Sequence, residues 1–114
     1  MSGISHLDQT ATQELRNIMG GDFGLLVQTF IRDSAQRIQA IRNGIHAADA
    51  DMLRRAAHSF KGSAANMGAP RLADICRALE EAGRLGEAAN MHPLIDELVQ
   101  EYGAVERELN ALLR

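Results

Sequence analysis

Residues 53–68, LRRAAHSFKGSAANMG, decide the fold, because their apolar positions recur at helical spacing. Steps of four and three alternate along this stretch, which is typical of a helix with one face in a core. The repeating positions are Leu53, Ala57, Phe60, Ala64 and Met67. His58 falls about 100° around the helix from that stripe. The stretch therefore predicts a helix that packs along one face and carries a histidine on its exposed flank.

Capping residues, glycines and prolines on either side predict one short helix and three more long ones. The expected helices run from the cap Asp8 to Met19, from the cap Asp22 to Ala47, from the cap Asp49 to Gly68, from Pro70 to a frayed end at Gly83–Gly86, and onward from Pro93. Four amphipathic helices joined by short loops pack most simply as an antiparallel up-down-up-down bundle. We therefore expect an all-α fold, in which the short N-terminal helix covers one end of a four-helix bundle.

Length and composition predict a single domain over residues 1–114, with 46% hydrophobic and 24% charged residues, as in soluble globular proteins. Cys76 is the only cysteine, and its apolar neighbours indicate a buried thiol in a reducing, cytoplasmic setting. No apolar run reaches the roughly 18 residues that a membrane span needs. The formal net charge of −3 and a short basic stripe without aromatic residues argue against nucleic-acid binding.

A cluster of small and basic residues surrounds the predicted position of His58. Lys61 is the only lysine of the chain, and it follows His58 by three positions on the same helical face. Gly62 follows by four, and a glycine inside a helix costs about 1 kcal/mol relative to alanine, so it needs a reason. Arg54 precedes His58 by four, so two cations are expected to flank the ring. Such a surface favours an anion beside a nucleophilic imidazole.

These residues resemble a known family. The run from His58 to Ala69, HSFKGSAANMGA, followed by Leu72, Cys76 and the pair Leu79-Glu80, is similar to the signature of histidine-containing phosphotransfer (HPt) domains of multistep phosphorelays. The helix pattern extends this resemblance over nearly the whole chain. It implies a carrier that accepts a phosphoryl group from the aspartyl phosphate of one receiver domain and passes it to another receiver.

The resemblance also implies roles for single residues. His58 matches the phosphoacceptor, Lys61 the cation beside the phosphate, Gly62 the small residue that admits the receiver, and Glu80 the residue that holds the inner ring nitrogen. A carrier of this kind has no cofactor, metal or kinase activity of its own, and Mg²⁺ is expected on the partner receiver. We expect a monomer. Because family members dock receivers through an apolar patch, the docking candidates are Leu15, Ile18, Met19, Phe23 and Ala65; the residues of the first helix and the following turn would alternatively form a lid on the core.

Several alternatives stay open at this stage. Gly62 could instead let two helices pack closely, and Glu80 could pair with Arg77 three positions before it. The chain could be a scaffold that binds receivers without accepting phosphate, or a phosphoacceptor fragment of a chemotaxis-type kinase, although no nucleotide-binding loop is present. A di-iron bundle is excluded because no Glu-x-x-His pair occurs.

Overall fold

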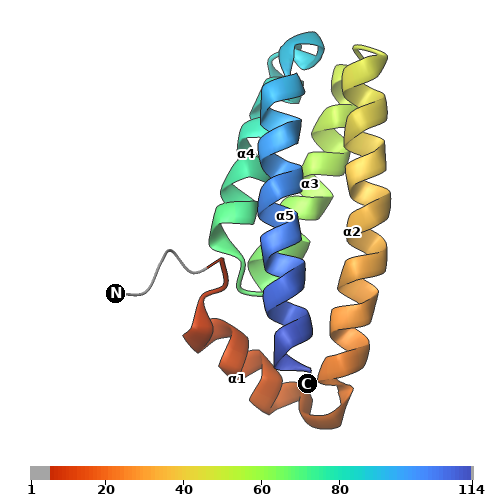
Figure 1. The fold of residues 1–114 in the computed structure, drawn as a ribbon. Coiled ribbons are helices and arrows are strands. Elements are labelled where there is room, and N and C mark those ends of the chain that lie inside the picture. The colour runs from red at the N-terminus through yellow and green to blue at the C-terminus, as the bar shows by residue number, and fades with distance from the viewer. Residues whose placement is uncertain (1–5, 114) are drawn as a thin grey trace.

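The computed structural model describes residues 6–113, and every regular element in that range is helical. The α-helices are α1 (Gln9–Met19), α2 (Phe23–His46), α3 (Ala50–Asn66), α4 (Pro70–Arg84) and α5 (His92–Leu112), with short 3₁₀ turns at Gly20–Asp22 and Ala88–Asn90. The four long helices, α2 to α5, run alternately up and down, and α1 lies across the lower end (Figure 1). The predicted four-helix bundle with an additional N-terminal helix is confirmed.

Most helix ends follow the local signals that the sequence carries. The side chains of Asp8 and Asp49 accept hydrogen bonds from the backbone N–H groups of Ala11 and Met52, at 3.2 and 3.0 Å. Gly68 ends α3 with a φ of +78°, a conformation that an L side chain rarely adopts. Each of these caps satisfies helix-end groups that would otherwise lack a partner.

Asp22 is the N-cap residue of α2, as predicted, but it does not cap that helix through its side chain. Residues 20–22 form a 3₁₀ turn that joins α1 to α2, and Asp22 has helical dihedral angles, φ −84° and ψ −4°. In that conformation its side chain makes no capping hydrogen bond, and the backbone N–H of Phe23 donates to the carbonyl of Gly20 instead. The chain thus turns from α1 into α2 through a tightened helical turn rather than through a start capped by a side chain.

The core is formed by the inward stripes of all four long helices. Three aromatic rings meet within it, those of Phe30, Phe60 and Tyr102, with centroids 6.2–6.4 Å apart. Cys76 is buried as a free thiol, as predicted. No helix in the described part of the chain is long and apolar enough to cross a membrane.

Two glycines fix α3 between its neighbours. A Cβ atom at Gly83 of α4 would lie 2.7 Å from the backbone nitrogen of Arg54 and 2.8 Å from the carbonyl oxygen of Ala50. A Cβ atom at Gly44 of α2 would lie 2.9 Å from the backbone nitrogen of Leu53. These two helices therefore approach the backbone of α3 from both sides near its N-terminus, and only glycine allows the contact.

Candidate functional site

His58 lies near the middle of α3, on the flank that faces solvent. Its side chain is 66% exposed, whereas Ala57 and Phe60 on the neighbouring stripe are fully buried. Burial of that stripe sets the rotation of the helix about its own axis, and the rotation places the imidazole ring outside the core.

Glu80 of α4 bridges two candidate site residues that α3 presents toward it. Its Oε2 atom lies 2.7 Å from Nδ1 of His58, and its Oε1 atom lies 2.6 Å from Nζ of Lys61. Arg77, the other partner considered for Glu80, instead donates to Asp74 at 2.6 Å. The structure therefore joins His58, Lys61 and Glu80 into one cluster across the α3–α4 interface.

The contacts of Glu80 determine the protonation pattern of the ring. The hydrogen bond from Lys61 is the main cause that lowers the pKa of Glu80, and the hydrogen bond with His58 lowers it further, while burial opposes both. Glu80 is accordingly ionised at neutral pH, so Nδ1 of a neutral His58 carries the ring proton and donates it. The lone pair then resides on Nε2, and among the described residues the only hydrogen bond of the ring is the one at Nδ1.

Gly62 opens the surface next to the ring. A Cβ atom built at this position would meet no atom within 4 Å, in contrast to Gly44 and Gly83. The alternative that Gly62 lets two helices pack closely is therefore wrong. The missing side chain serves no contact within the described part of the molecule, and it leaves free space one turn from His58.

The basic residues around the site are largely neutralised within the molecule. Arg54 donates to Asp51 at 2.9 Å, so it does not flank the His58 ring as a free cation, contrary to the expectation from spacing. It lines a groove together with Lys61 and Glu80 instead. Spacing in the sequence placed Arg54 on the right face but could not show that Asp51, three residues earlier, would hold its guanidinium group.

The docking candidates fall into two groups. Ile18 is 80% exposed, and Ala65 is also exposed on α3. Leu15 and Met19 are half-buried against the core, and Phe23 is 3% exposed, so Phe23 offers no surface to a partner. Leu15, Met19 and Phe23 therefore form the lid on the core that was the alternative to docking. Residues of α1 and the start of α2 close the lower end of the bundle (Figure 1).

Two further features were missed in the sequence. Leu25 of α2 is 65% exposed, and the helical period that turns Leu26 inward was the available signal for it. His6 places Nδ1 at 2.7 Å from Oε2 of Glu101, a carboxylate that is 6% exposed. This pair repeats the geometry of His58 and Glu80, but the His6 side chain is only 28% exposed. Accessibility therefore distinguishes His58, and the contact to a carboxylate does not.

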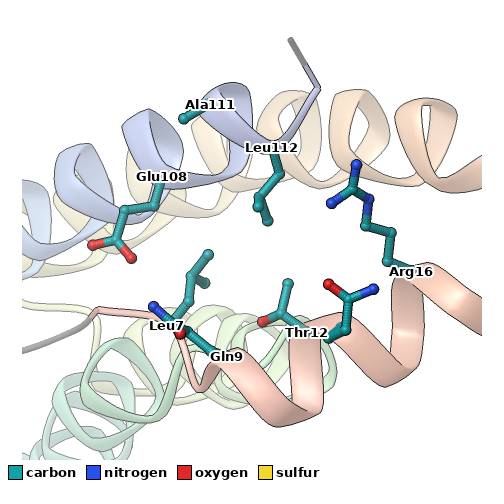
Figure 2. Close-up of a pocket in the computed structure, with 8 residues that line it drawn as sticks. Leu7, Gln9, Thr12, Arg16, Glu108, Ala111 and Leu112 are labelled. Atoms are coloured by element: carbon teal, nitrogen blue, oxygen red, sulfur yellow. The ribbon is translucent and has the colours of Figure 1, made fainter.

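A hollow of about 380 Å³ lies elsewhere, between α1 and the last turns of α5. Leu7, Thr12 and Leu112 point into it, with Glu108 and Arg16 at its two ends (Figure 2). None of the candidate site residues lines this hollow. Within residues 6–113, no group of three metal-ligating side chains comes together. The His58 ring is therefore exposed on the α3 face, beside the open groove that Lys61 and Glu80 line.

The comparisons with known proteins agree with this geometry. A family model described as "Hpt domain" matches residues 25–112. Among solved structures, the chain is similar to histidine-containing phosphotransfer protein B (HptB) from Pseudomonas aeruginosa PAO1, with 36% sequence identity and a TM-score of 0.90. That match covers 96% of this chain and 95% of the other. No curated protein sequence matches.

Proposed function

Because the chain belongs to the Hpt domain family of histidine phosphotransfer proteins, we propose that His58 is the residue that carries the phosphoryl group. The observation that supports this assignment most is the combination of a 66% exposed ring with a carboxylate on its inner nitrogen. Such a ring is held in one tautomer, and its nucleophilic nitrogen is accessible to another protein.

The proposed transfer needs no other reacting group on this chain. The lone pair of His58 Nε2 attacks the phosphorus of an aspartyl phosphate on a receiver domain, and a P–N bond forms. The P–O bond to the aspartyl carboxylate breaks, and its electron pair leaves with that carboxylate. Positive charge develops on the ring as it becomes phosphorylated, and the Glu80 carboxylate at 2.7 Å from Nδ1 stabilises that charge. The reverse sequence delivers the phosphoryl group to the next receiver.

Lys61 would offset the negative charge of the phosphoryl group in this proposal. In the unphosphorylated protein its ammonium group is bound to Glu80 at 2.6 Å, on the carboxylate oxygen that does not contact His58. A phosphoryl group on Nε2 would bring about two negative charges to the same surface. Lysine has a flexible stem and three donors, so Lys61 can turn toward the phosphoryl oxygens without displacing the bond between Glu80 and the ring.

The partners follow from the family. Hpt proteins interact with receiver domains in phosphorelays, and they carry phosphoryl groups rather than act as enzymes. For this chain we propose a cytoplasmic monomer that takes the group from one receiver and gives it to another. Mg²⁺ and most of the charge stabilisation of phosphoryl transfer would be supplied by the receiver.

The test is to mix the purified protein with phosphorylated receiver domains and to follow the label onto His58 as an acid-labile, alkali-stable adduct. We expect His58→Gln to abolish labelling while the helical content stays unchanged. His6→Gln is the matched control, since it removes the other histidine with a carboxylate on Nδ1, and it should transfer like the wild type. Labelling of the His58→Gln protein, or labelling by ATP alone, would contradict the proposal.

A further inference from the structure

The charges of α3 and α4 are almost completely paired. Within the described residues, every arginine and lysine on these two helices has a carboxylate oxygen within 4.0 Å: Arg54, Arg55, Lys61, Arg71, Arg77 and Arg84. Surface charges paired in this way attract a partner only weakly, because each cation is offset by a neighbouring anion. The side of the His58 face that borders α4 therefore carries little uncompensated positive charge.

The opposite side of the same face is different. Arg37 of α2 donates from Nε to the hydroxyl oxygen of Ser59 at 2.7 Å, and Ser59 follows His58 on α3. No described residue places a carboxylate within 4.0 Å of Arg37. Asp33, one turn earlier on α2, has its Oδ1 atom 3.6 Å from Arg32. The neutral hydroxyl of Ser59 thus holds the guanidinium group in place and leaves its charge uncompensated.

The position of this group indicates what it meets. Ser59 points about 100° around α3 from His58, so the Arg37 guanidinium lies beside the phosphoacceptor and not over its ring. A receiver that presents an aspartyl phosphate and binds Mg²⁺ has carboxylates around its reacting atom, since oxygen ligands hold that ion. When the reacting aspartate faces His58, carboxylates at the rim of that acidic site would lie toward Arg37.

We propose that Arg37 is an electrostatic docking residue that recognises carboxylates on the receiver surface, on the α2 side of His58. The inference rests on the proposed function, because it needs a receiver to dock at His58. Ser59 acts as the positioning residue, since its hydroxyl oxygen accepts a hydrogen bond that holds the Arg37 guanidinium group in one orientation. Attraction of this kind raises the rate of productive encounter and falls as salt screens it.

The experiment measures the rate of transfer from a phosphorylated receiver at several ionic strengths. Arg37→Gln should slow transfer about three- to tenfold at low salt and reduce the dependence of the rate on salt. Arg37→Lys should keep most of that salt dependence. The matched control is Arg42→Gln, because Arg42 is on the same helix but lines a different groove, with His46, His92 and Ile95, and it should leave the rate unchanged.

A small donor separates docking from chemistry. Labelling of His58 by phosphoramidate needs no receiver, so it should proceed equally in the wild type and in Arg37→Gln. If the wild type accepts phosphate from receivers and Arg37→Gln does so at the same rate and with the same salt dependence, the docking role is refuted and the proposed function stands. A changed hydrolysis rate of isolated phospho-His58 in Arg37→Gln would also overturn the inference, because Arg37 would then act on the phosphoryl group. If the wild type itself accepts nothing from receivers, the proposed function fails.

Discussion

Substitution of Gly62 by alanine should make the protein more stable. The new methyl group would enter open space, because a Cβ atom there meets nothing within 4 Å, and the position is inside α3. The remaining effect is the helical preference of alanine over glycine, about 0.5–1 kcal/mol in favour of the folded state. We therefore expect the free energy of unfolding to rise by about that amount.

The same substitution at Gly83 supplies the contrast. Its Cβ atom would lie 2.7 and 2.8 Å from backbone atoms of α3, which cannot move aside as a flexible side chain would. Overpacking of this kind costs about 1–3 kcal/mol, which exceeds the gain in helical preference. Gly62→Ala and Gly83→Ala should thus change stability in opposite directions. Both place alanine inside a helix, but Gly62 is exposed and Gly83 is buried against α3.

Urea unfolding followed by circular dichroism measures both variants. With a slope of about 2 kcal/mol per molar urea, Gly62→Ala should raise the midpoint by about 0.3–0.5 M at an unchanged slope. A lower midpoint for Gly62→Ala would refute the reasoning, because it would mean that the surface beside His58 is filled. The larger Gly62→Gln should stay folded and accept phosphoramidate label, yet it should fail to accept phosphate from a receiver. Unimpaired transfer by that protein would remove the proposed role of Gly62.

Two further predictions concern titratable groups. The hydrogen bond from Lys61 lowers the pKa of Glu80 in the folded state, so its carboxylate stabilises the fold above the unfolded value of about 4.3, and that contribution is lost as the pH falls through the lowered pKa. Glu80→Gln should accordingly be less stable than the wild type in urea unfolding at pH 7, with a deficit that shrinks below about pH 4; a constant deficit would contradict the sign. Burial raises the pKa of Cys76 to about 12, so at pH 8 iodoacetamide should alkylate the native protein about a thousandfold more slowly than the unfolded protein. Rapid alkylation of the native protein, measured by mass, would show that the thiol is accessible.

The parts of the fold that depend on local sequence could be predicted. The caps Asp8 and Asp49 act within three residues of themselves, and Gly68 ends α3 through its own backbone angle, so each signal is complete in a short stretch. The stripe of α3 likewise needs only its period, and it was enough to place His58 on the outside.

The remaining features depend on contacts that the sequence does not order. Asp22 has the residue type of a cap but sits in a 3₁₀ turn, and Arg54 has the spacing of a ring neighbour but binds Asp51. The Arg37–Ser59 bond joins positions 22 residues apart on two helices. To predict this hydrogen bond from the sequence, one would have to know that every carboxylate near Arg37 pairs with another cation. That requires the complete set of ion pairs, which the sequence does not give.

The close approach of Gly44 and Gly83 to the backbone of α3 has a consequence for the direction of signalling. Two neighbours bring main chain against main chain near the start of α3, so sliding or rotation of this helix would force backbone clashes. Under the proposed function, the donor and the acceptor receiver would then meet the same surface of this chain. The direction of phosphoryl transfer would then depend on the free energy of hydrolysis of each receiver's aspartyl phosphate. This chain would not favour either direction.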